Sequence, residues 1–336
     1  MASQTEIARL AGVSQSVVSR VLNGRARQFG IAPATEARVT ALAANLGYAP
    51  NPAASMLLGG ASKLVGVVVR SFDDPFLATI LQELNRGALA SGHTLLVVGL
   101  DGDERHRAEE VRLVQRYRPD ALIVVGTTDF SGWTADLFPE GKPVVQIGLP
   151  TPDPRVVSCG IDEPAAARDL VRHLHHEKGH RHFGLIGDIN AASHTRARLL
   201  RAALREITDP VTLSCDFLSP HEGAAAGAHG AEFLLGPDAS DPRPTALIAT
   251  GDLIALGLVR ALGERGIDVP GALAIASYDD VPAAALLRPS LTTIRQPARD
   301  LATAAMAIVT GDAPLRPVLL PATLVAREST APAVTG

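Results

Sequence analysis

Apolar residues recur along this chain in two different patterns. In the first fifty residues they follow the spacing of amphipathic helices, in three short segments. The positions are Ile7, Leu10 and Ala11, then Val18, Val21 and Leu22, then Val39, Leu42 and Leu46. The pattern therefore predicts three short helices that share one small core.

Local signals predict where these helices begin and end. Ser3 and Glu6 have the spacing of a capping box, and Gly12 ends the first helix. Ser14 can cap the second helix, and Pro33 suits the first position of the third, which ends at Gly47. Two short helices joined by a tight turn, followed by a third, indicate a helix-turn-helix head.

Beyond residue 62 short apolar runs alternate with helical stretches. A first block contains "LVGVVV", "HTLLVVGL", "ALIVVG" and "VVQIG", and a Pro-rich break, "LPTPDPRVV", precedes a second. The second block contains "VVSCGID", "HFGLIGD", "TLSCDF", "TALIAT", "LAIASYDD" and "LTTIRQ". This alternation predicts an α/β core with parallel sheets in two similar subdomains, and a ligand site at the carboxyl ends of the strands.

The second helix carries polar residues opposite its apolar face. Gln15 and Ser16 lie at its N-terminal end and can meet base edges, and Arg20 can reach a guanine or a phosphate. Val17 points partly outward and can touch a thymine methyl group. The pattern favours DNA binding, and the alternative is a small helical cap with a solvated polar face.

Charge supports the first interpretation. The 336-residue chain has a net charge of −4, but residues 1–62 contain five arginines, no lysine, two glutamates and no aspartate. The head therefore carries +3 and the rest −7, which is typical of a segment that meets a polyanion. Apolar residues make up 46% and aromatic residues only 4%, so the core consists mainly of aliphatic side chains.

Cys159 and Cys215 lie in predicted strands, which favours buried, reduced thiols over a disulfide. The opening "MASQTEIARL" lacks the pattern of a signal peptide, and no apolar run is long enough to span a bilayer. We therefore expect a cytoplasmic protein without a membrane partner.

Catalytic and metal motifs give little support for an enzyme. His176 to His180 spell H-E-x-x-H, but Gly179 disfavours the helix that a zinc site needs. We expect His173, His175 and His182 in a solvated helix end and turn. The pair Asp279 and Asp280 is better explained by ligand hydroxyls than by acid–base catalysis. We expect no cofactor, no metal and no catalytic residue.

The stretch "IARLAGVSQSVVSRVLNG" closely resembles the signature of the lac repressor family (LacI/GalR) of bacterial transcriptional regulators. Later stretches, such as "DDPF", "GHRHFGLIG", "SYDDVPAAALLRPSLTTIRQP" and "LVARES", resemble family landmarks, so the likeness spans nearly the whole chain. It departs at Gln4, Glu6 and Val17 and in a longer loop, "RARQFGIAP". The resemblance implies a core like that of periplasmic sugar-binding proteins, a homodimer and a hinge helix that forms on DNA.

The resemblance also implies roles for particular residues. Gln15, Ser16 and Arg20 fall on base-reading positions, whereas Ser3, Ser14, Ser19 and Asn23 contact or orient the DNA backbone. The run 53–58 is too short to hold a helix unaided, so its alternative is a flexible linker. In the implied hinge helix Leu57, with Ala54, meets the minor groove.

For the effector site the resemblance implies residues from several strand ends. These residues are Asp73, Asp74, Phe76, Asp279 and Gln296. An ungapped match places His194 where an arginine grips the ligand, and a slip of one or two residues restores Arg196. Gly148 and Gly251 stand where polar ligand-binding residues are common.

We therefore predict a DNA-binding transcriptional regulator, a repressor, which binds a pseudo-palindromic double-stranded operator under control of a sugar-related effector. The alternative is a solute-binding protein of the same core fold without a regulatory role. The expected domains are a head at 1–50, a hinge and linker at 51–62, and a core at 63–330. Within the core we expect one subdomain at 63–155 plus 293–318 and the other at 156–292 plus 319–330.

Overall fold

The computed structural model describes residues 3–22, 24–48, 62–100, 104–126, 141–236, 242–330 and 332. The chain divides into two compact units, Met1–Lys63 and Leu64–Gly336, here called the head and the core. Asn23 lies outside the described residues, as do Ala54 and Leu57, which were predicted to belong to a hinge helix. Among the described helices, none has the length and the apolar character needed to cross a membrane.

The head consists of helices α1 (Gln4–Ala11), α2 (Gln15–Leu22) and α3 (Pro33–Asn45), with a 3-10 turn η1 (Arg27–Phe29) between α2 and α3. Ser3 caps α1, because its Oγ accepts a hydrogen bond of 3.2 Å from Glu6 N, and Gly12 ends the helix with a φ of +64°. The predicted apolar faces meet in one core of Ile7, Ala8, Ala11, Val18, Val21, Ala26, Val39 and Ala43. The predicted three helices and their shared core are confirmed, except at Leu10, which was expected on the apolar face of α1 but is 46% exposed.

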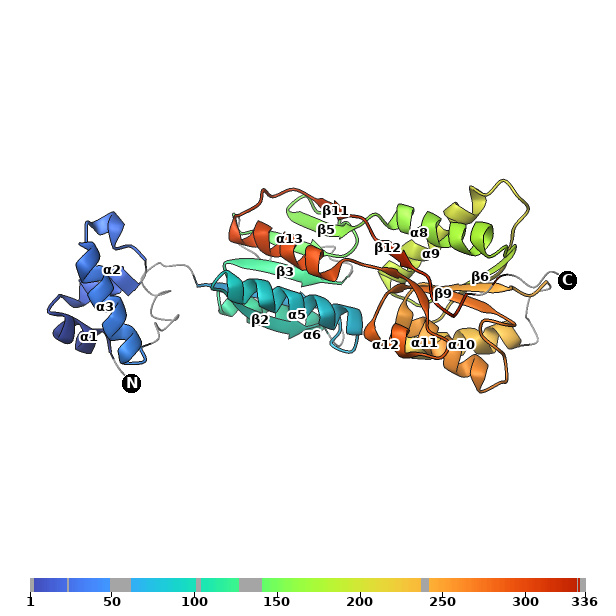
Figure 1. Ribbon diagram of the computed structural model, residues 1–336, viewed down its shortest axis with the longest axis horizontal. Helices are drawn as coiled ribbons and strands as arrows, with labels where there is room; N and C mark the ends of the chain where they lie inside the picture. The colour runs from blue at the N-terminus through green and yellow to red at the C-terminus, as the bar shows by residue number, and fades with distance from the viewer. Residues whose placement is uncertain are drawn as a thin grey trace. The chain divides into compact units, whose positions relative to one another are not determined.

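The core contains two six-stranded sheets (Figure 1). The first has the order β11-β5-β4-β3-β1-β2 and the second the order β12-β10-β9-β8-β6-β7. All pairs are parallel except β10 with β12, which are antiparallel. The first sheet and its helices are called lobe 1 here, and the second sheet and its helices lobe 2.

In lobe 1 the elements are β1 (Leu64–Val69), α5 (Pro75–Ala90), β2 (Thr94–Gly99), α6 (Glu104–Arg116), β3 (Ala121–Val125), β4 (Val144–Ile147), β5 (Val156–Ile161), α13 (Ala298–Thr310) and β11 (Val318–Leu320). Helices α5 and α13 come from opposite ends of the core sequence and pack side by side on this sheet (Figure 1). Gly87 permits this contact, because a Cβ there would lie 2.9 Å from Met306 Cγ.

In lobe 2 the elements are α8 (Glu163–Arg172), the π-helical turn η2 (His173–Glu177), β6 (His182–Gly187), α9 (Ala191–Arg205), β7 (Thr212–Leu218), α10 (Gly223–Leu235), β8 (Ala246–Ala249), α11 (Asp252–Gly263), β9 (Ala274–Asp279), α12 (Pro282–Leu286), β10 (Thr292–Arg295) and β12 (Thr323–Val325). Helices α10 and α11 pack against each other, as do α8 and α9.

The chain crosses between the lobes three times, from β5 to α8, from β10 to α13, and from β11 to β12. The expected subdomain limits are therefore wrong at β5 and β10, and the limit at residue 318 also cuts through β11, which pairs with β5 in the first sheet. Val156–Ile161 pairs with β4 in the first sheet, and Thr292–Arg295 pairs with β9 in the second. At β5 and at β10 the chain passes to the other lobe only after the strand has ended, because the whole strand pairs within its own sheet.

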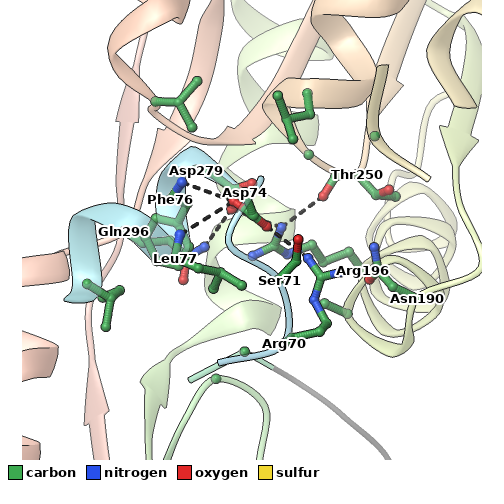
Figure 2. A pocket seen from close by; sticks show the side chains of 18 of the residues that line it. Arg70, Ser71, Asp74, Phe76, Leu77, Asn190, Arg196, Thr250, Asp279 and Gln296 are labelled. Atoms are coloured by element: carbon green, nitrogen blue, oxygen red, sulfur yellow. Dashed lines mark hydrogen bonds and ion pairs between the residues drawn. The ribbon is translucent and has the colours of Figure 1, made fainter. Parts of the chain in front are cut away.

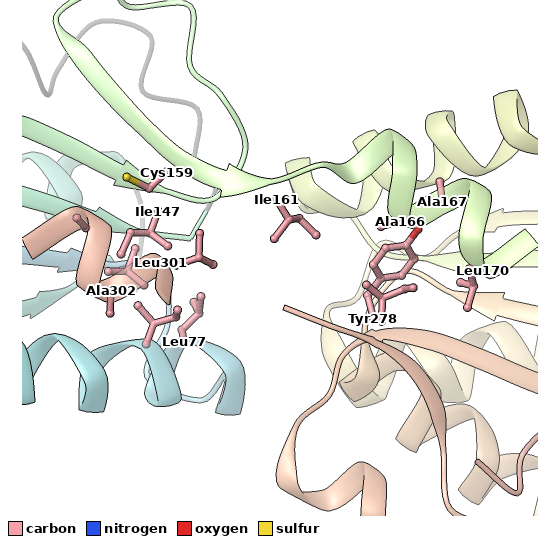
Figure 3. Packing of buried hydrophobic residues seen from close by; sticks show 14 of the residues in the cluster. Leu77, Ile147, Cys159, Ile161, Ala166, Ala167, Leu170, Tyr278, Leu301 and Ala302 are labelled. Carbon is pink, nitrogen blue, oxygen red and sulfur yellow. The ribbon is translucent and has the colours of Figure 1, made fainter. Parts of the chain in front are cut away.

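One apolar cluster runs through the crossing region. Figure 3 shows Leu77, Ile147 and Leu301 in lobe 1 and Ala166, Leu170 and Tyr278 in lobe 2, with Ile161 between the two groups. Ile161 is the last residue of β5 and is buried. The two lobes therefore share a continuous core at the point where the chain passes between them.

Candidate functional site

Helix α2 presents its polar side chains away from the head core. Gln15, Ser16 and Arg20 are exposed, whereas Val17 and Ser19 are half-buried. Ser14 begins the helix, since its Oγ accepts a bond of 3.4 Å from Val17 N and lies 2.8 Å from Ser16 Oγ. Because Val18 and Val21 hold the opposite face in the core, these exposed side chains are fixed on one surface.

A cavity of about 400 Å³ lies between the two lobes of the core. Its walls come from the carboxyl ends of parallel strands in both sheets. Gly126 and Gly148 follow β3 and β4 of lobe 1, and Asp188 and Thr250 follow β6 and β8 of lobe 2. Asp279 is the last residue of β9. The cavity therefore lies where the alternating strand pattern predicts a ligand site.

Arg196 is the buried cation of this cavity. Its Nη1 donates to Asp279 Oδ1 at 3.1 Å and to the Thr250 carbonyl at 2.8 Å, and its Nε lies 3.3 Å from Glu163 Oε1 (Figure 2 shows the first two bonds). Its guanidinium also lies 4.6 Å from the centre of the Tyr278 ring. These hydrogen bonds and the ring contact hold the Arg196 side chain in one position in the wall of the cavity.

Burial and charge oppose each other in this cluster. Burial alone would lower the pKa of Arg196, but the carboxylates of Glu163 and Asp279 reverse the effect and raise it. Burial raises the pKa of Glu163, and the nearby Arg196 charge only partly offsets this rise. The cluster is thus a buried ion-pair network in which removal of one member leaves charge uncompensated.

The loop after β9 places Asp279 with a strained backbone. Asp279 has a φ of +111° and Asp280 a φ of +56°, values that non-glycine residues seldom adopt. Asp280 is held by Arg295 Nε at 2.6 Å and by Arg327 Nη2 at 2.5 Å. Gln296 Nε2 donates to Asp279 Oδ1 at 2.6 Å. Strain supported by so many bonds is typical of a functional position.

The carboxylate of Asp252 holds the same loop by hydrogen bonds. It accepts bonds from Val281 N at 2.8 Å, from Thr293 Oγ1 at 2.7 Å and from the Ser277 hydroxyl. The side chain is fully buried. Burial, followed by the negative charge of Asp279, raises the pKa of Asp252 to about 7.

A second polar group closes the cavity from lobe 1. Asp74 caps α5, because its Oδ1 accepts bonds from Phe76 N at 3.0 Å and Leu77 N at 3.4 Å. Arg70 Nη2 lies 2.9 Å from Asp74 Oδ2, and its Nη1 lies 3.0 Å from Glu222 Oε2 in lobe 2. Burial and the Asp279 charge raise the pKa of Asp74, although Arg70 opposes them. Arg70 therefore links the two walls.

The structure brings most of the predicted cavity residues together. Those that line the cavity are Asp73, Asp74, Phe76, Arg196, Asp279 and Gln296. His194 does not, and that expectation is wrong: the cap at Asn190 sets the phase of α9, so that Ala192 and Arg196 face inward and His194 faces solvent. Gly148 and Gly251 line the cavity without side chains.

Sequence reasoning missed several polar residues of the cavity. These are Arg70, Glu163, Asp188, Asn190, Glu222 and Thr250. Most of them follow a predicted strand within a few residues, so the rule of strand ends could have found them. Glu163 was not predicted, because a charged first residue of a helix is usually solvated.

The prediction that His173 and His175 lie in solvent is also wrong. His173 and His175 are buried, because the helix widens at η2 into i→i+5 bonds such as Lys178 N to His173 O, 3.1 Å. His173 Nδ1 lies 2.7 Å from Glu177 Oε2 and its Nε2 3.0 Å from Thr330 Oγ1. Within the described ranges, no group of three potential metal ligands occurs.

Both cysteines are free and buried, as predicted. Burial raises the pKa of each thiol to about 11. Neither cysteine lines the cavity.

Residues 5–51 match the family model of bacterial regulatory proteins, lacI family, and residues 171–330 match the periplasmic binding protein-like domain. The chain is 26% identical over 312 residues to the HTH-type transcriptional repressor PurR of Photobacterium profundum, covering 92% of this chain and 91% of that protein. It is 28% identical to the ribose operon repressor of Escherichia coli over 316 residues, 90% of each chain.

A crystal structure of the lac repressor dimer, bound to operator and the anti-inducer ONPF, has the same fold, with a TM-score of 0.81. It is 24% identical in sequence, and the likeness covers 98% of this chain and 99% of that one. The curated relatives are transcriptional repressors and not enzymes. With its helix-turn-helix head and its two-lobed core, this chain belongs to the lacI family of bacterial regulatory proteins.

Proposed function

We propose that the protein is a transcriptional repressor, which binds a two-fold symmetric operator as a homodimer and changes its affinity when a small effector fills the cavity between the lobes. The observation that carries the proposal is the exposed polar face of α2, on a head whose family model is that of DNA-binding regulators. As a cytoplasmic regulator, it would meet both DNA and metabolites directly.

The chemistry of α2 supports direct base recognition. A glutamine side chain pairs well with adenine in the major groove, and an arginine pairs well with guanine. Gln15 and Arg20 present these two groups from the two ends of one short helix. Ser3, Ser14 and Ser19 are proposed to contact or orient the phosphate backbone beside them, and Asn23 to do so beyond the described residues.

The cavity favours an effector rich in hydrogen-bond donors. Each described lining side chain with a nitrogen donor already bonds a carboxylate: Arg70 bonds Asp74 and Glu222, Asn190 bonds Asp188, Arg196 bonds Asp279 and Glu163, and Gln296 bonds Asp279. An anionic effector would compete with those carboxylates for the same donor groups and be repelled by their charge. A hydroxyl-rich effector needs acceptors, and both bonds to Asp279 reach Oδ1 rather than Oδ2.

We therefore infer an uncharged polyhydroxyl effector, in line with a sugar and unlike a sugar phosphate. Asp279 would accept from its hydroxyls, and Gln296 and Asn190 would orient it. Asp73 and Phe76 would contact it from the lobe 1 side of the cavity. Gly148 and Gly251 line the cavity without side chains, which would leave more of it to the effector.

The domain roles follow from this proposal. Residues 1–50 would bind DNA, residues 51–62 would form the hinge helix with Ala54 and Leu57 at the minor groove, and residues 63–330 would bind the effector and form the dimer. Such a hinge is a bistable element, and an effector that prefers one state by a few kcal/mol would shift it.

Selection from random double-stranded DNA tests the DNA-binding proposal. The full-length chain is expected to enrich a pseudo-palindrome with half-sites about one helical turn apart, and the affinity should fall steeply with salt. Enrichment of no sequence over random DNA would contradict the proposal. Thermal-shift measurements with D-ribose, D-glucose and their phosphates test the effector class: stabilisation by phosphates alone would contradict it.

A further inference from the structure

A phenylalanine from the loop after the second helix lies against the Arg20 side chain. The Arg20 guanidinium carbon lies 4.2 Å from the centre of the Phe29 ring, within the range of a cation–π contact. Arg20 is exposed in the last turn of α2, and Phe29 ends the 3-10 turn η1 with 46% of its surface exposed. The Phe29 ring therefore lies at the surface of the head, against the side chain that the resemblance places at a base-reading position.

The loop that carries Phe29 is firmly anchored. Ala26 is buried in the head core, and Arg25 N donates to Arg20 O at 2.8 Å. Phe29 N lies 3.3 Å from both Arg25 O and Ala26 O, and Ile31 N donates to Ala26 O at 2.9 Å. These bonds fix the backbone of Phe29 relative to α2, so the ring has a defined place beside Arg20.

We propose that Phe29 is a positioning residue, which orients the Arg20 guanidinium for base recognition and so contributes to operator specificity. This inference rests on the proposed DNA-binding function. A ring that contacts the guanidinium through its π-face restrains the side chain and takes up none of its N–H groups by hydrogen bonding, so they remain free to donate. Those N–H donors are the groups that pair with guanine O6 and N7.

An aromatic ring suits this task better than a carboxylate. A glutamate beside Arg20 would fix the side chain but neutralise its charge and repel the DNA phosphates. The ring fixes it without loss of charge. Within the part of the head that the structure describes, Arg20 forms no ion pair, and Arg25 and Arg27 are exposed on the same loop. The positive charge of this surface therefore remains available for DNA.

A double-mutant cycle on the full-length chain tests the inference. DNA selected by the wild-type chain supplies the operator, and Arg20→Ala identifies the base pair that depends on Arg20. Phe29→Ala should lower discrimination at that base pair by roughly 2- to 5-fold, the factor that matches an exposed cation–π contact. Phe29→Tyr, which keeps the ring, should restore it. In the Arg20→Ala background, Phe29→Ala should have no further effect.

Leu10→Ala is the matched control, because Leu10 is an equally exposed apolar side chain of the head, at 46%. It should leave discrimination at that base pair unchanged, and thermal unfolding should show that all variants keep the folded head. Equal weakening on all sequences by Phe29→Ala, or additive effects in the cycle, would overturn the inference and indicate a direct DNA contact of Phe29. If the wild-type chain selects no operator, the proposed function itself fails.

Discussion

Arg70 of lobe 1 and Glu222 of lobe 2 form an ion pair across the cavity, with Nη1 3.0 Å from Oε2. Arg70 also pairs with Asp74 at the N-terminus of α5, so its side chain is held at the lobe 1 end. Glu222 precedes α10 and is half-exposed. The pair therefore joins the lobes through side chains, in addition to the three segments of backbone that connect them.

Glu222→Gln should loosen the closed arrangement of the lobes. Because the pair is partly solvated, we expect a loss of less than about 1 kcal/mol in the free energy of unfolding. Small-angle scattering should show a larger radius of gyration without effector and a return to the wild-type value with it. Glu232→Gln is the control, since Glu232 faces Arg265 within lobe 2. Identical scattering of wild type and Glu222→Gln would contradict the prediction.

Asp279→Ala should abolish the effector response and, because Arg196 keeps its pair with Glu163, leave operator binding largely intact. Removal of the carboxylate leaves effector hydroxyls unpaired, at about 1–3 kcal/mol for each group. Operator release as a function of effector concentration measures this effect. Asp312→Asn, an exposed carboxylate at the end of α13, serves as the control. A normal response at unchanged effector concentration would show that Asp279 is structural only.

Arg196→Met should destabilise the core. The substitution leaves Glu163 buried without its cation, and broken buried pairs typically cost about 3–5 kcal/mol. Urea denaturation measures the loss. The double variant Arg196→Met/Glu163→Gln should recover part of it, because the uncompensated charge is gone. Equal stability of the single and double variants would show that the charge of Glu163 is not the cause.

Asp252 should make the stability of the core depend on pH. Its pKa is raised from 3.8 to about 7 in the folded state, so the folded chain keeps a proton that the unfolded chain releases between these values. The contribution of this group to stability therefore falls as pH rises from about 4 to about 7. It is least favourable above that range.

Asp252→Asn removes this titration but loses an acceptor for one of three bonds. The variant should be less stable than wild type at pH 5, and the difference should shrink towards pH 8. Urea unfolding at four pH values gives the comparison. A constant difference over this range would mean that Asp252 stays ionised throughout.

Leu57→Ala should weaken binding to the operator and reduce DNA bending, with little change in the thermal stability of the core. Leu57 lies outside the described residues, and the prediction rests on its place in the proposed hinge. A side chain that wedges between base pairs unstacks a step at a cost of a few kcal/mol and bends the duplex. If affinity and bending are unchanged, residues 51–62 act only as a flexible linker and Leu57 does not contact DNA.

Strong, long patterns were predicted correctly from the sequence. The strands from Leu64–Val69 to Thr292–Arg295 follow the apolar runs, because buried parallel strands need continuous apolar residues. The three-residue strands Val318–Leu320 and Thr323–Val325 escaped notice, since so short a run has no detectable period. Assignment of strands to sheets also failed at β5 and β10, because the order along the chain does not reveal a crossing.

The site shows the same limit at the level of single residues. A match without gaps selected His194, but the true phase of α9 is set by the hydrogen bond from Ser193 N to Asn190 Oδ1, 2.8 Å. His173 and His175 were expected in solvent, yet one widened turn of helix rotates both inward. A helix cap and a widened turn are local features that apolar periodicity alone does not contain.

The three crossings between the lobes have a consequence for how the chain can be divided. The head core draws only on residues 7–48, so it forms one continuous stretch that can be exchanged for another head. Neither lobe has this property. Lobe 1 needs α13 and β11 from the far end of the sequence, and lobe 2 needs β12 after them. A cut at any single point in the core would leave at least one lobe incomplete, so recombination can exchange the DNA-binding head more readily than one lobe of the core.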